Sequence, residues 1–567
     1  MRFGFLPSGI GFKAAACSFL LSPRSFLQLC RNPGRLASDD EADVEALAAW
    51  MVTSGTHTVP GSGKTLLIVS LLPLQYPIKV EMLMALAMRQ CGYKVVVLTN
   101  IASHALVKAY HADLNGCEIH LLEDYLRLGN TRCFSSLIRE LLASSADLMQ
   151  RVKGFRYRDA YTGLHALATL SSSVTDGKIL ISEAGRGRLK RTLKRSMHLS
   201  DAAAAVVAKT QPTLMVSVEK GFVGTAEIFY AALNAGVDYV QWAGCHEPDS
   251  IMLKRYSWNN CREHPFSIAN ASWTQILELP WSDKYREDVM AQFARGYKEG
   301  AWFRYKNLAT DQKQVAKQEL LAQLGLDSAK KTAVIYSHIL NDANLFYGQD
   351  LFSGGSEEWL VETVRVAAEN PHVNWVLKLH PSNVYRNAKL GYTGEYGEIL
   401  ALKHAFGKVP DFLRVVYPEE KTSPFSFFQI TDFGITVRGT VGLELPCFGV
   451  PVLTAGTGRY AGKGFTVDSA TREEYLAKIR AIHDIQPLTE EQTRRGQRYA
   501  YFVFRVRPAR YGYMFSDQYN FPLEHSRNRD IALGEMPLDA LLDHPQMKKI
   551  ADFLCSDEED FLDFSAA

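Results

Sequence analysis

TVRGTVGLELPCFGVPVLTAGTGRYAGKGFT, residues 436–466, is the stretch from which the fold of this chain is most readily predicted. Apolar and β-branched residues at 430–437 predict a buried strand that leads into it. A tight turn and a short helix follow, and residues 450–454 predict the next strand, which ends in the glycine-rich loop 455–460. The order strand, turn, helix, strand is typical of a parallel α/β sheet.

The turn Arg438-Gly439-Thr440 contains the groups of this stretch that could bind a ligand. Gly439 allows the backbone to approach a ligand closely, and Thr440 is a plausible N-cap for the short helix. Free N–H groups, the helix dipole and Arg438 would then meet at one point, which suits a phosphate or a carboxylate. Glu444 follows one turn later and can accept hydrogen bonds from a ribose diol, whereas Pro446 is expected to shorten the helix. The turn predicts a sugar-nucleotide site; an ordinary βαβ turn with a surface Arg and Glu is the alternative.

Composition narrows the class of protein. A chain of 567 residues is too long for one core, so we expect two domains with additional segments. Its 47% hydrophobic and 22% charged residues are typical of a soluble globular protein, and a net charge of +2 argues against a nucleic-acid binder. The 9 cysteines form no CxxC pair, which favours a reducing compartment over a disulfide framework or a zinc site. With no apolar run long enough to span a bilayer, we expect a cytoplasmic protein.

The first 56 residues are expected to be a disordered extension or an over-long start. Residues 1–37 contain basic but no acidic side chains, so a secretory signal, a transit-like peptide and an interfacial anchor are alternatives. The following GSGKT, residues 61–65, is not expected to be a P-loop. Thr58 stands where that motif needs a glycine, and the predicted strand comes after the motif instead of before it.

Residues 57–309 are predicted to form a first Rossmann-like domain that binds the acceptor. Strands are expected at 66–72, 93–98, 213–218 and 238–242, with helices at 78–91 and 225–234 and Gly92 as a C-cap. Glu219 and Lys220 follow a strand and are the first choice for acceptor-side chemistry. His246 and Glu247 are the second choice, and either pair is alternatively an ordinary loop.

The segment Arg186–Arg195, RGRLKRTLKR, is strongly basic. A solvated helix face is the favoured interpretation. The alternative is a patch that meets anionic headgroups or a lipid-diphosphate acceptor, which would place the protein at the inner face of the membrane.

A linker helix is expected within 310–330, followed by a second α/β domain at 331–485. Its strands are predicted at 332–339, 373–379 and 413–416 and within the opening stretch. Residues that follow parallel strands meet at one edge of a sheet. That edge should therefore collect Lys378, His380, Arg438, the N–H of Thr440 and Tyr460, with Glu444 as the ribose contact. Such a cationic, donor-rich site suits a nucleotide phosphate and an acidic sugar.

The remaining residues, 486–567, are expected to hold C-terminal helices and an acidic tail. Residues 489–505 predict a helix of the kind that crosses back to the first domain of a two-domain α/β protein. Residues 556–563 are acidic and are predicted to be disordered.

Taken together, these motifs resemble the bacterial capsule polysaccharide biosynthesis family of GT-B glycosyltransferases, which includes Kdo transferases of capsule assembly. The resemblance covers roughly residues 210–505 and is densest in the second domain. The matching stretches are KLHP (378–381), VRGTVGLE (437–444), GVPVLT (449–454), AGTGRY (455–460), GKGFT (462–466), KGFVGT (220–225), VQW (240–242) and SHILND (337–342).

The resemblance implies two Rossmann-like domains facing across a cleft, with a C-terminal helix crossing back. It implies transfer of a sugar from a nucleotide-sugar donor to a growing surface glycan or glycolipid. His380 and residues 438–440 would hold the donor phosphate and the sugar carboxylate, and Glu444 the ribose. Further donor contacts are expected from Lys378, Pro381, Tyr460, Lys463 and Asp342. Many members have an aromatic residue at the place of Asn341 and an acidic one at that of Ser382, so CMP-Kdo is one candidate donor.

The expected chemistry needs no bound metal and no cofactor, because a cationic site can stabilise the leaving phosphate. An inverting reaction would need a general base, for which Glu219 and Glu247 are candidates; a retaining reaction would not. Three alternatives remain open: a sugar-nucleotide 2-epimerase, a polyol-phosphate transferase, and a non-catalytic partner in polysaccharide assembly or export.

Overall fold

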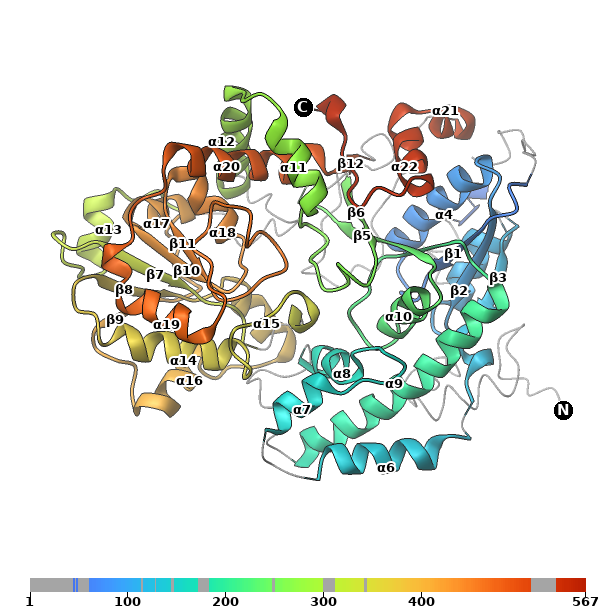
Figure 1. Ribbon diagram of the computed structural model, residues 1–567, viewed down its shortest axis with the longest axis horizontal. Coiled ribbons are helices and arrows are strands. Elements are labelled where there is room, and N and C mark those ends of the chain that lie inside the picture. Colours follow the sequence, from blue (N-terminus) through green and yellow to red (C-terminus); the bar gives the residue numbers. More distant parts are fainter. Residues whose placement is uncertain are drawn as a thin grey trace. The chain divides into compact units, whose positions relative to one another are not determined.

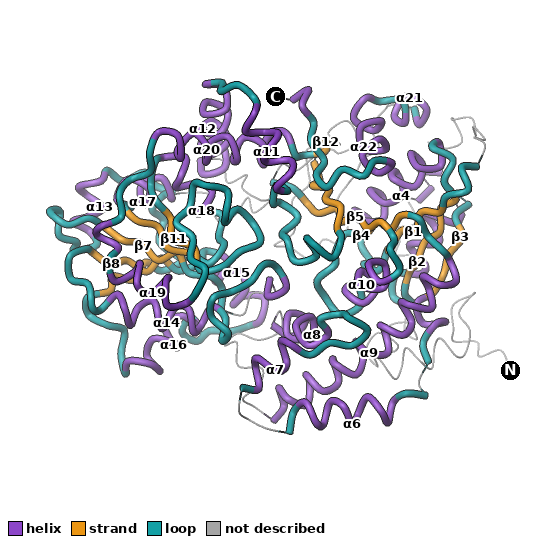
Figure 2. Tube along the Cα trace, viewed as in Figure 1, coloured by secondary structure: helices purple, strands orange, loops and turns teal. Residues whose placement is uncertain are grey.

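The described part of the chain forms two compact units (Figures 1 and 2). The computed structural model describes residues 44–45, 47–48, 61–113, 116–127, 129–143, 147–171, 183–246, 250–298, 312–340, 344–510 and 537–566. Unit 1 takes its residues from 1–166, 187–261 and 508–563, and unit 2 from 167–186, 262–507 and 564–567. The chain thus enters unit 2 briefly at 167–186, returns to unit 1, forms most of unit 2 at 262–507, and comes back to unit 1 before its last four residues.

Unit 1 is built on a seven-stranded sheet of order β12-β6-β5-β4-β1-β2-β3. From β3 to β5 the strands are parallel, and β6 and β12 extend the sheet antiparallel. The strands are β1 Thr65–Val69, β2 Lys94–Thr99, β3 Glu118–Leu121, β4 Leu214–Ser217, β5 Asp238–Gly244, β6 Ser250–Tyr256 and β12 Ala509–Arg510. The helices before residue 262 and after residue 510 are α4 Gln75–Gln90, α5 His104–Val107, α6 Thr131–Leu141, α7 Leu148–Gly154, α8 Thr162–Ser171, α9 Glu183–Thr210, α10 Ala226–Asn234, α21 Leu538–Leu542 and α22 Pro545–Cys555.

Alternate residues of β1 fill two separate cores. Leu66 and Ile68 pack with α4, α21 and α22, whereas Leu67 and Val69 pack with α9 and α10. Figure 1 shows α4 and α22 on one side of this sheet and α9 and α10 on the other. The period of two follows from the alternation of side chains along a strand, and it gives a three-layer unit. Val44 and Leu47 also pack in the first core; apart from residues 44–45 and 47–48, the predicted extension 1–56 lies outside the described residues.

Unit 2 contains a five-stranded parallel sheet of order β11-β10-β7-β8-β9. Its strands are β7 Thr332–Tyr336, β8 Asn374–Lys378, β9 Leu413–Val416, β10 Phe433–Thr436 and β11 Val452–Thr454. Its helices are α11 Asn270–Glu278, α12 Asp283–Lys298, α13 Lys317–Gln323, α14 Ser356–Ala367, α15 Ser382–Leu390, α16 Gly397–Phe406, α17 Pro424–Ile430, α18 Val441–Glu444, α19 Arg472–Arg480 and α20 Glu490–Tyr501. Core residues of α14, α16 and α19 cover one face of the sheet, and those of α13 and α17 cover the other (Figure 1).

The unit boundaries differ from those expected. Helices α11 and α12 lie in unit 2, although the sequence suggested a first domain that extends to residue 309. The expected linker helix is α13, whose Leu320 and Leu321 are buried against β7 and β8 of unit 2. Residues 490–507 stay in unit 2, and the return to unit 1 comes at Pro508. The helix predicted at 489–505 is confirmed as α20 and the π-helical turn Phe502–Val506.

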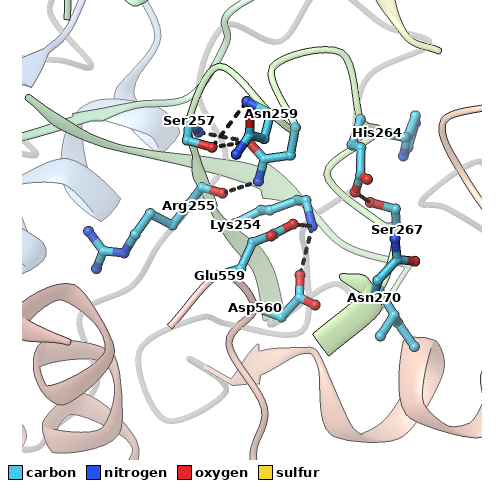
Figure 3. Close-up of polar contacts among 12 residues, drawn as sticks. Lys254, Arg255, Ser257, Asn259, His264, Ser267, Asn270, Glu559 and Asp560 are labelled. Atoms are coloured by element: carbon cyan, nitrogen blue, oxygen red, sulfur yellow. Dashed lines mark hydrogen bonds and ion pairs between the residues drawn. The ribbon is translucent and has the colours of Figure 1, made fainter. Parts of the chain in front are cut away.

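The acidic C-terminal tail is ordered, so the prediction of disorder at 556–563 is wrong. Lys254 of β6 is fully buried and forms ion pairs with Glu559 at 2.7 Å and with Asp560 at 2.9 Å (Figure 3). Lys549 pairs with Asp563 in the same way. A charge run is expected to be solvated when nothing opposes it. Here the buried Lys254 and the half-buried Lys549 of the same unit oppose it, and their positions are set by the fold.

Helix α4, which overlaps the helix predicted at 78–91, is buried on almost all of its surface. The reason is that α22, which follows hundreds of residues later, packs on it. Glu81 is left fully buried, and neither of its oxygens makes a hydrogen bond within the described residues. Burial raises the pKa of this carboxyl to about 8.

We expect the stability of unit 1 to depend on Glu81. Its pKa of about 8 in the folded state lies above the usual carboxyl value of 4.5, so only the folded state holds the proton between these values, and stability is lost as pH rises toward and through 8. Glu81→Gln should remove this loss, and at pH 9 it should be more stable than wild type by a few kcal/mol, ~3. Urea denaturation midpoints at pH 6 and pH 9 measure the effect. Glu118→Gln, at an exposed carboxylate, is the control; a wild-type midpoint that does not fall with pH contradicts the prediction.

Candidate functional site

A cavity of about 360 Å³ opens at the carboxyl edge of the unit 2 sheet. In the order β9-β8-β7-β10-β11, the chain reverses direction across the sheet between β7 and β10, and crevices at such points bind ligands in α/β proteins. Its volume lies in the range of small-molecule sites. The polar residues that line it include Tyr297, Ser337, His338, Asp350, Lys378, His380, Ser382, Arg438, Gly439, Thr440, Glu444 and Arg459. The predicted meeting of strand ends 337–338, 378–382 and 436–440 is therefore present in the structure.

The turn after β10 has the local structure that the sequence suggested, in a shorter form. Helix α18 covers only Val441–Glu444, and a 3-10 turn with Pro446 near its start continues it. Proline cannot donate to an α-helical ladder, which explains the early end. Thr440 occupies the N-cap position, but its side chain caps no backbone N–H. A single helical turn has a weak dipole, so the anion-binding capacity of this site depends on side chains.

Arg438 lines the cavity, but its guanidinium already has partners. Nη2 forms an ion pair with Oδ1 of Asp350, and Nε donates to the carbonyl of Thr457 at 3.1 Å. Asp350 follows a loop that no sequence motif marked. Arg438 is therefore less available to a ligand than the sequence suggested, and Asp350 fixes its orientation.

Two other cations in the cavity form no direct ion pair among the described residues, although Glu420 interacts with the first and Glu444 with the second at longer range. Lys378, at the end of β8, has its Nζ over the ring of Phe427 at 4.8 Å and forms no ion pair. Burial lowers its pKa to about 8, and the more distant Glu420 opposes the shift only in part. Arg459 donates to the carbonyl of Arg438 at 3.4 Å, and burial lowers its pKa as well. Both cations are thus held in surroundings that disfavour their charge.

His380 and Pro381 line the cavity as expected. Nδ1 of His380 accepts a hydrogen bond from the N–H of Ser382 at 3.2 Å, which fixes the ring. The N–H of His380 donates to Oγ of Ser337 at 3.1 Å, and that hydroxyl donates to the buried Glu398. This chain of bonds ties the ends of β7 and β8 together.

Glu444 also lines the cavity, but it is only 2% exposed. Its Oε2 accepts a hydrogen bond from the hydroxyl of Tyr297 in α12, and its Oε1 has no partner within the described residues. Burial raises the pKa of this carboxyl, and the bond from Tyr297 opposes the shift. Contact with a ribose therefore stays a prediction, since Tyr297 occupies one of the two oxygens in this structure.

Two residues predicted to contact the donor do not line the cavity. Tyr460 is buried, and its hydroxyl donates to the carbonyl of Gly439 at 2.6 Å. A Cβ at Gly442 would lie 2.0 Å from that hydroxyl, so glycine is needed there for Tyr460 to support the turn. Lys463 is buried as well and donates to Oδ1 of Asn270 at 2.6 Å. Asp342 lies outside the described residues.

The residues proposed for acceptor chemistry belong to unit 1. Lys220 is buried, donates to the carbonyl of Cys261 at 2.7 Å and lies over the rings of Phe229 and Tyr256, so it acts as a structural residue. Glu219 has an Oε2 without a partner in the described chain, and burial raises its pKa to about 7.

Only one residue of the second-choice pair lies in the described part of the chain. His246 is buried, with Nδ1 at 3.1 Å from Sγ of Cys245, and Glu247 lies outside the described residues. Within the described residues, no cluster of three or more His, Cys, Asp or Glu could hold a metal ion.

Several lining residues had not been assigned a role from the sequence, among them His338, Asp350, Arg459 and Tyr297. His338 and Arg459 follow strands whose ends were predicted to meet at this edge of the sheet. Their location could therefore be predicted, but their roles were not. Asp350 and Tyr297 come from a loop and from α12, whose packing no local pattern indicates.

The order of strands decides the fold class. Each unit holds parallel strands in the order third, second, first, fourth, fifth, which is the doubly wound Rossmann arrangement. The chain contains two Rossmann-like units. Among the described residues, no helix is both long and apolar enough to cross a bilayer.

No family model matches this chain, and no curated protein matches it. It is similar to the solved structure of KpsC, beta Kdo 2,4 transferase, from Thermosulfurimonas dismutans, at 13% identity and a TM-score of 0.32, over 52% of this chain and 81% of that one. It is also similar to a UDP-GlcNAc 2-epimerase from Neisseria meningitidis bound to UDP-GlcNAc, at 12% identity and a TM-score of 0.25, over 77% and 95% of the two chains. A glycosyltransferase from Rickettsia africae shows 9% identity and a TM-score of 0.24, over 88% and 100%. Likenesses this distant carry no activity to the chain, which is argued from its site.

Proposed function

We propose that this protein is a glycosyltransferase that binds a nucleotide sugar in the unit 2 cavity and transfers the sugar to a growing bacterial surface or capsular polysaccharide. One observation carries the proposal: Lys378 and Arg459 line a cavity at the switch point of a parallel sheet and form no ion pair among the described residues, although Glu420 and Glu444 interact with them at longer range. A buried cation is costly unless an anion neutralises it. The phosphate of a nucleotide sugar supplies that anion.

The chemistry follows from the same residues. As the bond between sugar and nucleotide breaks, negative charge develops on the leaving phosphate, and preorganised cations stabilise it at that point. Glu219 of unit 1 is our proposal for the general base of an inverting reaction, because a pKa of about 7 is matched to proton transfer near neutral pH.

For the donor, CMP-Kdo is the candidate, since a sugar carboxylate would use a second cation of the cavity. For the acceptor, we propose a glycan or glycolipid at the inner face of the cytoplasmic membrane. The basic segment 186–195 lies in α9, where Arg186, Lys190 and Arg191 are exposed, so this face has the charge that anionic headgroups attract.

A thermal-shift screen with CMP, CDP, UDP, GDP, dTDP, ADP and ATP tests the function. We expect CMP to raise the melting temperature, because a ligand at 100 times its Kd stabilises the native state by about 2.7 kcal/mol. The shift should be reduced in His380→Ala, which alters the cavity wall. Stabilisation by UDP, GDP or CDP alone would replace the candidate donor and bring the epimerase and polyol-phosphate alternatives forward. No shift with any nucleotide would overturn the proposal in favour of a non-catalytic assembly partner.

A further inference from the structure

His338 stands directly after β7, in the wall of the cavity, and its Nε2 is fully engaged by the protein. The N–H groups of Val437 and Arg438 both donate to Nε2, each at 3.3 Å. The hydroxyl of Thr436 lies 3.0 Å from the same nitrogen. The imidazole therefore holds the turn that follows β10 in place.

These contacts fix the position of the ring proton. A backbone N–H can only donate, so a nitrogen that faces two of them must present its lone pair. Thr436 fits this arrangement, because its oxygen accepts the N–H of Gly439 at 3.2 Å and its hydroxyl can donate to Nε2. In a neutral imidazole one nitrogen accepts and the other donates. The proton of His338 is consequently on Nδ1.

Nδ1 is the remaining polar atom of this side chain. It makes no hydrogen bond within the described residues, and it does not belong to the buried polar atoms that lack a partner. Around it, the guanidinium groups of Arg438 and Arg459 contribute positive charge, and the ring of Trp359 lies against the imidazole with centroids 5.9 Å apart. Burial and these cations lower the pKa of His338 to about 3. The side chain is therefore neutral at any physiological pH.

We propose that His338 is a ligand-binding residue that donates its Nδ1–H, as a neutral imidazole, to the anionic group of the donor. The inference rests on the proposed function, since it names a contact to the same anion. A neutral donor of fixed tautomer adds a directed hydrogen bond without adding a third unpaired charge beside Lys378 and Arg459. It also does not switch with pH, unlike an ordinary histidine.

The tautomer can be measured without any ligand. In full-length protein labelled with ¹⁵N at its 15 histidines, we expect the resonances lost in His338→Gln to show a protonated Nδ1 and an unprotonated Nε2, unchanged from pH 5 to pH 8. An Nε2–H tautomer, or a titration near pH 6.5, overturns the proposal.

Two variants then separate the two nitrogens. His338→Gln places an amide oxygen near the Nε2 position and can still hold the turn, but it loses the donor at Nδ1. His338→Asn keeps an amide donor near Nδ1 and loses the acceptor. With inorganic pyrophosphate and CMP as probes in calorimetry, we expect His338→Gln to bind about 10- to 100-fold more weakly than wild type at a similar melting temperature. His338→Asn should retain more affinity and lose melting temperature.

The outcomes distinguish this inference from the proposed function. If wild type binds neither pyrophosphate nor any nucleotide, the proposed function fails and the His338 contact fails with it. If wild type binds a nucleotide and His338→Gln binds it equally well, only the His338 contact is overturned.

Discussion

Lys378→Met is expected to weaken the binding of the nucleotide about 10- to 100-fold while leaving the free protein at least as stable as wild type. A hydrogen bond to a charged group contributes about 1.5–3 kcal/mol, which gives the loss of affinity. The stability follows from the absence of an ion pair at Lys378 in the described chain, because methionine removes a charge whose burial is unfavourable. Arg459→Met should behave alike. Calorimetric titration and thermal melts without ligand measure the two quantities on one sample.

The same prediction has a pH dependence with a defined sign. In the free protein, burial lowers the pKa of Lys378 from its usual value of 10.5 to about 8. A bound phosphate favours the ammonium form, so binding takes up a proton around pH 8 and affinity falls as pH rises beyond it. This fall should be absent in Lys378→Met. Lys463→Met is the matched control, at a buried lysine outside the cavity. Unchanged affinity in Lys378→Met, or a clear loss of stability without ligand, would contradict the assignment of Lys378 to the anion.

Lys254→Met is expected to destabilise unit 1 by about 3–5 kcal/mol, the usual result of removing one member of a buried ion pair. The side chains of Lys254 and Asp560 are both 0% exposed, so the variant leaves a carboxylate buried with its partner gone. The fall in the urea midpoint of unit 1 measures the effect. Lys408→Met is the control, since Lys408 and Asp411 are 69% and 83% exposed and such pairs contribute about 0–1 kcal/mol.

A second variant checks the cause of that loss. Lys254→Met combined with Asp560→Leu replaces both charges by apolar groups, and such replacements are often neutral. We therefore expect the double variant to recover most of the lost stability. If it is no more stable than Lys254→Met alone, the ion pair is not the origin of the effect.

The sequence predicted the parallel strands well because their apolar runs are local and continuous. β7, β8, β10 and β11 all lie within the stretches proposed for them, and the strand ends met as the topology of such sheets requires. The expected effect of Pro446 was also confirmed, since a missing N–H acts on its own helix.

What the sequence could not give is pairing between distant residues. Arg438 was predicted as a free cation, but Asp350, which lies 88 positions earlier, is its partner. Tyr460 and Lys463 carry donor groups at plausible positions, yet their partners, Gly439 and Asn270, are set by tertiary packing. The acidic tail is the clearest case, because its order depends on Lys254, about 300 positions away. The charge of the tail predicted that it would be solvated, but the tail is ordered because it pairs with the buried Lys254.

The discontinuity of unit 1 has a consequence for synthesis. Residues 508–563 contain the strand β12 and the carboxylate that neutralises Lys254. They leave the ribosome after all strands of unit 2. Until then β6 is an open sheet edge beside an uncompensated ammonium, while all strands of unit 2 have already been made. Domains that fold as units during translation usually do so from the N-terminus. In this chain the order is reversed: the strands of unit 2 can all pair before unit 1 is complete, because unit 1 still lacks residues 508–563.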